Sequence, residues 1–171
     1  IPDSVTNIGE YAFNGCKSLG EIKIPDGVTG IGRNAFYKCT GLEKITLPGS
    51  LANIDGYVFY NCTSLTAVTI PDGITSIGRA AFERCTGLKE ITVPTSVTSI
   101  AESTFTDCPE LTVRCEPDSY AADHARSNGI KWACIKHSWN SEPTIDKETS
   151  CTGAGSRSIH CAFCNAADEN T

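Results

Sequence analysis

The stretch LGEIKIPDGVTGIGRNAFYKC, residues 19–39, contains the pattern that decides the fold. Ile22 and Ile24 alternate with charged residues, which is typical of a strand with one buried and one exposed face. Pro25 ends this strand because proline has no amide hydrogen to donate to a neighbouring strand. The rest of the stretch carries apolar residues at irregular spacing, which indicates a turning segment.

The same unit recurs every 23 residues. One of its positions holds Cys16, Cys39, Cys62, Cys85 and Cys108, and another holds Phe13, Phe36, Phe59, Phe82 and Phe105. A single unit has no second layer to cover its apolar side, whereas stacked units bury a continuous column. Each buried Phe or Leu contributes roughly 1.5–3 kcal/mol of transfer free energy. The spacing therefore predicts a right-handed solenoid of five repeats in residues 1–115. We expect a parallel β-sheet on one face and short helical or 3₁₀ turns on the other.

The repeat has the form C-x-x-L-x-x-(I/V)-x-(I/L/V)-P-x-(G/S)-(V/I/L)-x-x-I-x-x-x-(A/V/T)-F. This form resembles the BspA-like leucine-rich repeats of bacterial surface proteins, and the resemblance covers residues 1–115. It implies a leucine-rich-repeat solenoid at the cell surface with a role in adhesion and protein binding. It brings no catalytic residues with it.

Residues 116–135 leave the repeat. Asp118 or Ser119 can cap a helix, Asn128-Gly129 is a helix stop signal, and residues 130–134 read as a final strand. The segment is similar to the helix-strand cap at the end of such family members, and an open sheet edge needs such a cover.

The ten cysteines fall into three groups. The five repeat cysteines are predicted to be buried free thiols, with disulfides between neighbours as the alternative. Cys115 and Cys134 lie in adjacent predicted strands with the same inward parity. Either a disulfide or two buried thiols fit there.

The third group belongs to residues 136–171, a small tail module with too few apolar residues for a core of its own. The C-x-x-C knuckle at Cys161 and Cys164 is typical of a zinc site. The proposed structural zinc ligands are His137, Cys151, Cys161 and Cys164. His160 is the alternative imidazole, and a Cys151 disulfide to Cys161 or Cys164, or a disordered tail, remains open. With four protein ligands a zinc-ribbon-like site is closed and structural.

Composition excludes several function classes. The 171 residues carry a net charge of −6 and no basic block, which argues against nucleic-acid or anionic-membrane binding. No apolar run approaches the ~18 residues that a membrane helix requires. No nucleophile elbow, phosphate loop or H-E-x-x-H motif occurs, so we expect no enzyme activity. The chain lacks Met and starts in the middle of the repeat pattern, so we expect it to be part of a longer protein.

The remaining candidate is the outward face of the predicted sheet. Its residues are Glu21, Lys23, Glu43, Lys44, Thr46, Thr66, Thr69, Lys89, Glu90 and Thr92. Such a face can bind a protein, or a glycan, or can simply be a solvated surface. Tyr37, Tyr57 and Tyr60 are expected on the opposite side. The sequence thus predicts a non-catalytic, secreted or cell-surface module for adhesion or protein–protein contact, with a spacer or a glycan-binding module as the alternatives.

Overall fold

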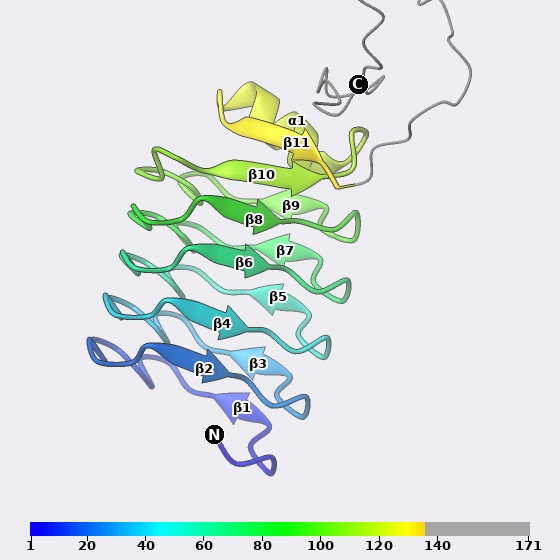
Figure 1. The fold of residues 1–171 in the computed structure, drawn as a ribbon. Helices are drawn as coiled ribbons and strands as arrows, with labels where there is room; N and C mark the ends of the chain where they lie inside the picture. The colour runs from blue at the N-terminus through cyan, green and yellow to red at the C-terminus, as the bar shows by residue number, and fades with distance from the viewer. Residues whose placement is uncertain (136–171) are drawn as a thin grey trace, which may run out of the picture.

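The computed structural model describes residues 1–135. These residues form a stack of coils, which we number 1 to 5 for residues 1–23, 24–46, 47–69, 70–92 and 93–115 (Figure 1). The stack confirms the leucine-rich-repeat solenoid with a parallel β-sheet. Within residues 1–135 no helix is long and apolar enough to cross a membrane.

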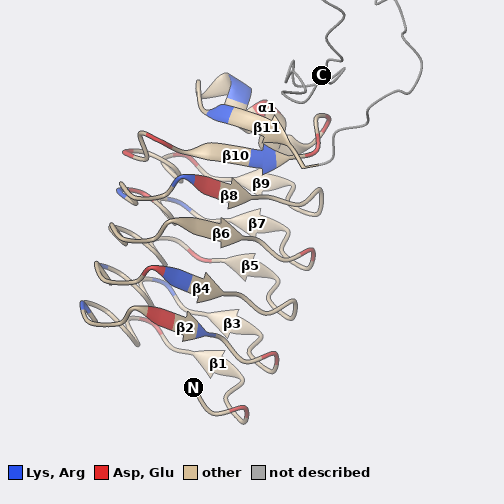
Figure 2. Cartoon of the chain, viewed as in Figure 1, with Lys and Arg blue, Asp and Glu red and all other residues tan. Residues whose placement is uncertain are grey.

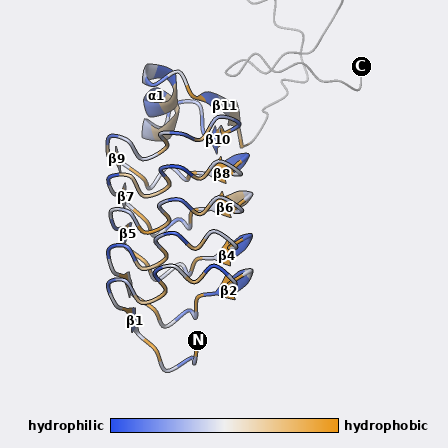
Figure 3. Ribbon diagram, turned by 90° about the vertical axis from the view of Figure 1, so that its left-hand side faces the viewer, coloured by the Kyte–Doolittle hydropathy of each residue, from blue (hydrophilic) through white to orange (hydrophobic). Residues whose placement is uncertain are grey.

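Each coil contributes one strand to the front of Figure 1 and one shorter strand behind it. The front strands are β2 (Glu21–Lys23), β4 (Lys44–Thr46), β6 (Ala67–Thr69), β8 (Glu90–Thr92) and β10 (Thr112–Cys115). The rear strands are β1 (Asn7–Ile8), β3 (Gly30–Ile31), β5 (Asn53–Ile54), β7 (Ser76–Ile77) and β9 (Ser99–Ile100). The rear ladder was not predicted. Figure 3 shows the two columns of strands on opposite sides of the stack.

The core fills the space between the two ladders. Five phenylalanines form one column in which successive ring centroids lie 5.0, 5.5, 5.2 and 6.0 Å apart. Phe36, Phe59 and Phe82 are fully buried, and the rings are close to parallel. Because each coil covers the rings of the coil below it, the column reproduces the register that the 23-residue spacing predicts.

The turn segments differ from the prediction. We call residues 9–15, 32–38, 55–61, 78–84 and 101–107 together the turn side. They are hydrogen-bonded turns, so the expectation of short helical or 3₁₀ pieces there is wrong. In coil 2, Asn34 and Lys38 adopt φ of 60° and 57°, and the corresponding residues of the other coils also have positive φ. This left-handed backbone breaks any helical run.

The positive φ values have a structural reason. They turn alternate amides toward the next coil, so that Phe36 N donates to Val58 O at 2.9 Å and Lys38 N donates to Tyr60 O at 2.8 Å. The intervening amides close β-turns, as when Tyr37 N donates to Asn34 O at 3.0 Å. The turn side thus satisfies its backbone donors by stacking, which outweighs a cost of roughly 1–2 kcal/mol for each left-handed residue.

Glycine lies at several points where neighbouring coils approach closely. A Cβ at Gly41 would lie 2.1 Å from Lys17 O, and one at Gly87 would lie 2.4 Å from Thr63 O. Both distances are shorter than real Cβ contacts, so a larger residue at either position would require the backbone to shift.

A helix and a strand follow coil 5. Helix α1 (Tyr120–Ser127) begins after Ser119, whose Oγ accepts a hydrogen bond from Ala122 N at 3.2 Å. It ends at Asn128, and Gly129 has φ of 63°. Strand β11 (Lys131–Cys134) then pairs in parallel with β10. The helix and strand predicted for residues 116–135 are both present.

Candidate interaction surface

All ten residues predicted for the sheet surface lie on one side of the stack, which we call the strand face. Eight of them are exposed, and Glu90 and Thr92 are half-buried. They line up because the front strands pair in parallel without a shift, so that Glu21 is opposite Lys44 and Thr69 is opposite Thr92. The structure therefore brings the ten together, and their role in binding stays a prediction.

The strand face carries charges of both signs in equal number. Glu21 and Lys44 are cross-strand neighbours of opposite sign, an arrangement that contributes roughly 0.2–1 kcal/mol to a sheet. Glu90 accepts a hydrogen bond from Arg114 on β10 at 3.3 Å, an ion pair that the sequence analysis did not single out. Figure 2 shows both signs of charge along these strands and none on β6. The face is polar and nearly neutral.

Strand pairing is interrupted between coils 2 and 3. On the front, β2 and β4 form one sheet and β6, β8, β10 and β11 form another. On the rear, β1 and β3 are separate from β5, β7 and β9. Across this junction the backbone contact continues on the turn side, where Phe36 N donates to Val58 O at 2.9 Å.

Three tyrosines gather on the turn side of the same junction. The rings of Tyr37 and Tyr60 stack at 4.8 Å with 6° between their planes, and the Tyr57 ring is 5.9 Å from Tyr60. All three are half-buried. Tyr37 and Tyr60 occupy the same position of the 23-residue unit and stack as the phenylalanines do, whereas Tyr57 comes from a different position.

Basic side chains surround these rings. The Arg33 guanidinium lies 5.0 Å from the centre of the Tyr57 ring, and the Lys38 ammonium lies 5.2 Å from the centre of the Tyr37 ring. Arg84 donates to the Tyr60 hydroxyl at 3.4 Å. We call Arg33, Tyr37, Lys38, Tyr57, Tyr60 and Arg84 the tyrosine–arginine cluster.

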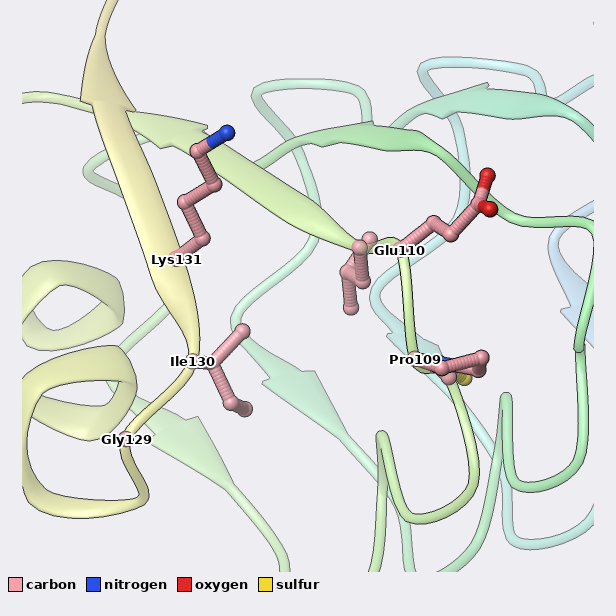
Figure 4. Close-up of a pocket in the computed structure, with 7 residues that line it drawn as sticks. Pro109, Glu110, Gly129, Ile130 and Lys131 are labelled. Carbon is pink, nitrogen blue, oxygen red and sulfur yellow. The ribbon is translucent and has the colours of Figure 1, made fainter.

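A cavity of about 550 Å³ opens between coil 5 and the C-terminal segment. Pro109 and Glu110 line one side, and Gly129, Ile130 and Lys131 line the other (Figure 4). Glu110 and Lys131 are charged but lie on separate segments, and Figure 4 shows no convergence of their ends on one point. Ligand sites hold a few convergent polar groups, so this cavity lacks that signature.

The repeat cysteines form a column of thiols. Cys39, Cys62 and Cys85 are fully buried, and each donates through Sγ to the carbonyl of a phenylalanine in the coil below, at 2.9–3.2 Å. This confirms the prediction of buried free thiols for these three. Burial raises the pKa of Cys39 to about 11 and raises the pKa of Cys62 and Cys85 further. Neutral buried thiols are inert, so the column supports packing and not nucleophilic chemistry.

The ends of the thiol column differ from its middle. Cys16 in coil 1 is exposed, and Cys108 in coil 5 is half-buried. At the other end of the stack, the His124 ring meets the edge of Phe105 at 6.1 Å, and burial lowers the pKa of His124. His124 thus has a packing role.

Two further sets of predicted site residues remain. Cys115 and Cys134 are opposite each other in the β10–β11 register, and both are fully buried. Neighbouring parallel strands lie close enough for a disulfide, which stays a prediction. The proposed zinc ligands His137, Cys151, Cys161 and Cys164 lie outside the described residues. No group of three potential metal ligands occurs within residues 1–135.

Comparison with known proteins gives the same architecture. The sequence profile of the BspA type leucine-rich repeat region matches residues 1–112 as six copies. A leucine-rich repeat protein of T. pallidum is 38% identical, with a TM-score of 0.63 over 64% of this chain and 52% of its own. A leucine-rich cell surface protein of Faecalibacterium prausnitzii is 37% identical, with a TM-score of 0.66 over 77% of this chain and 34% of its own.

A third solved structure, a leucine-rich repeat protein of Eubacterium ventriosum, is 31% identical, with a TM-score of 0.62 over 65% of this chain and 30% of its own. This chain therefore spans about half or less of the length of the proteins that it resembles. The comparison with curated proteins found no match.

The match over residues 1–112 covers most of the chain. The protein therefore belongs to the BspA-type leucine-rich repeat family.

Proposed function

We propose that the chain is a non-catalytic interaction module of an extracellular bacterial surface protein. The observation that carries this proposal is the strand face, where outward side chains from successive coils stand in register on a rigid stack. Solenoids of this kind offer an extended surface that suits a macromolecule better than a small substrate. Leucine-rich repeats commonly serve protein interaction, and the solved relative from Faecalibacterium prausnitzii is described as a cell surface protein.

A spacer function is the second candidate. It is favoured by the balanced charges of the strand face, three glutamates against three lysines, because a surface with no net charge has little long-range attraction for a partner. In this case the stack would hold another domain at a distance from the cell and would bind nothing itself.

An array of host matrix proteins and cell-wall glycans probed with the full chain separates these functions. Saturable binding to a protein supports the interaction module, and binding to glycans alone would move the proposal to a glycan-binding module. No binding to any member of the array would contradict the interaction module and leave the spacer. Turnover of an arrayed substrate would contradict both.

We also propose that residues 116–135 cap the stack. Strand β11 covers the edge of β10 that would otherwise be open, and α1 buries Ala121, Ala122 and Ala125. An uncovered parallel edge invites pairing with other chains. Truncation after residue 115 should therefore produce aggregates in size-exclusion chromatography, whereas truncation after residue 135 should not. A monomeric product of the shorter truncation would contradict the cap.

Two predictions about cysteines complete the proposal. The spacing of Cys161 and Cys164 supports one structural zinc held with His137 and Cys151. Native mass spectrometry should find one zinc per chain, lost in Cys164→Ser, and a metal-free chain would contradict the site.

The facing positions of Cys115 and Cys134 support a disulfide between them. Peptide mapping without reduction should find the two linked, and separate peptides would overturn it.

A further inference from the structure

The tyrosine–arginine cluster is a surface feature of coils 2 to 4 that the repeat explains only in part. We propose that it is a docking site for an acidic segment of a protein partner. This inference rests on the proposed interaction function and adds to it a second contact surface on the turn side of the stack.

Two cations of the cluster have no acidic partner in the described part of the chain. Arg33 and Lys38 are exposed, and within residues 1–135 neither forms an ion pair. They lie instead over the rings of Tyr57 and Tyr37. Their positive charge therefore remains available to a carboxylate.

The surface around the cluster is positively charged. Segments 32–38, 55–61 and 78–84 hold four basic side chains against Asp55 and Glu83, so this surface is positive while the whole chain is at −6. At physiological salt the Debye length is about 8 Å, so a partner that touches the cluster responds to these nearby charges more than to the total. Asp107 competes for Arg84 at 3.9 Å, but that pair is mostly exposed and therefore weak.

The cluster consists of residue types that are common in binding sites. Tyr and Arg, with Trp, are enriched among the side chains that dominate binding at protein interfaces. Here the rings and guanidinium groups already hold one another in place, with Tyr37 and Tyr60 stacked at 4.8 Å. A preordered surface loses less side-chain entropy when a partner binds.

The partner class follows from these features. Unneutralised cations select carboxylates, and flat stacked rings offer apolar area to the backbone and side chains of an extended segment. An acidic stretch of protein, rich in Asp or Glu, matches both.

The test is fluorescence anisotropy of the full chain with a synthetic glutamate-rich peptide, compared with the same peptide carrying glutamine. The double variant Arg33→Gln with Lys38→Gln removes two cluster cations. Lys23→Gln with Lys44→Gln removes the same charge from the strand face and is the matched control. We expect the acidic peptide alone to bind, with affinity reduced about tenfold or more in the cluster variant and less than about twofold in the control. Tyr60→Ala should also weaken binding.

Three results would overturn the docking site. The first is that the acidic peptide does not bind to the wild-type chain. The second is that the cluster and control variants lose the same affinity for the peptide. The third is that heparin binds in place of the peptide, which would indicate an anionic glycan as the partner. Failure here is distinguishable from failure of the proposed function. A protein found on the array that binds to the cluster variant but not to the strand-face variant would support the interaction module. This result would also show that the cluster is not its binding site.

Discussion

The strand face and the turn side are built from the same 23-residue unit but differ in how they present their side chains. On the strand face, extended backbone and unshifted pairing place equivalent positions in straight rows, with opposite charges beside each other. On the turn side, left-handed residues hold the backbone in tight turns and support a cluster found only around coils 2 to 4. This difference shows that a periodic sequence can form a local surface cluster where variable side chains of neighbouring coils contact each other.

The largest expected effect comes from the core beneath the turn side. Phe59→Ala removes the central ring of a column in which Phe36 and Phe82 lie 5.5 and 5.2 Å away. We expect the free energy of unfolding to fall by about 3–5 kcal/mol, because large-to-small changes in a packed core leave a cavity. Urea denaturation measures the change. Phe13→Ala, in a half-buried ring at the end of the column, should cost less, and equal costs would contradict the stacked column.

The thiol column gives a pH dependence. Burial raises the pKa of Cys39 to about 11 from 9.0, so the folded state keeps the proton that the unfolded state releases. The unfolded state therefore binds fewer protons than the folded state in this pH range. The contribution of Cys39 to the free energy of unfolding should be complete below pH about 9 and should decline toward pH about 11. Denaturation curves across this range should show a smaller decline in Cys39→Ala than in the wild type. An unchanged decline would mean that other groups are responsible.

A smaller effect is expected at Tyr57. Replacement by asparagine removes the contact with Arg33 but relieves the left-handed backbone, and the two changes nearly cancel. Tyr57→Asn should therefore change the free energy of unfolding by less than about 1 kcal/mol. Tyr57→Val loses the same contact without the relief and should be clearly less stable by thermal denaturation. Equal melting temperatures of the two variants would show that the backbone is not strained there.

The smallest effect belongs to the strand face. Thr69 is exposed on β6 and faces Thr92, and Thr69→Ala should change stability by no more than about 0.5 kcal/mol. Calorimetry would detect a larger change. A loss above about 1 kcal/mol would mean that this face contributes to folding as well as to recognition.

The sequence predicted the repeat, the buried column, the parallel front sheet and the helix and strand that follow coil 5. These features are predictable because equivalent side chains, such as Phe36, Phe59 and Phe82, recur at a fixed spacing. Each of them packs in its coil in the same way. The rear ladder and the true form of the turns escaped prediction. Both depend on hydrogen bonds between coils, such as that from Lys38 N to Tyr60 O, which leave little local trace in the residues.

The candidate sites divide in the same way. The strand-face residues follow from strand parity, so their shared location could be predicted from Glu21, Lys23 and their counterparts. Only part of the tyrosine–arginine cluster could be predicted in this way. The spacing of 23 residues between Tyr37 and Tyr60 indicates that their rings stack. The contact of Arg33 with Tyr57 could not be predicted, because these residues are 24 positions apart in variable parts of the repeat.

By itself the sequence determined that the chain must stack, because no single unit can bury its own apolar side. The tertiary structure alone decided which variable side chains meet, and so where exposed cations rest on aromatic rings without a carboxylate to neutralise them. Burial of the repeated side chains stabilises every unit in the same way, so the sequence of one unit is enough to predict it. Contacts between different coils depend on the exact rise and turn of the stack, and these are set only when the whole chain has folded.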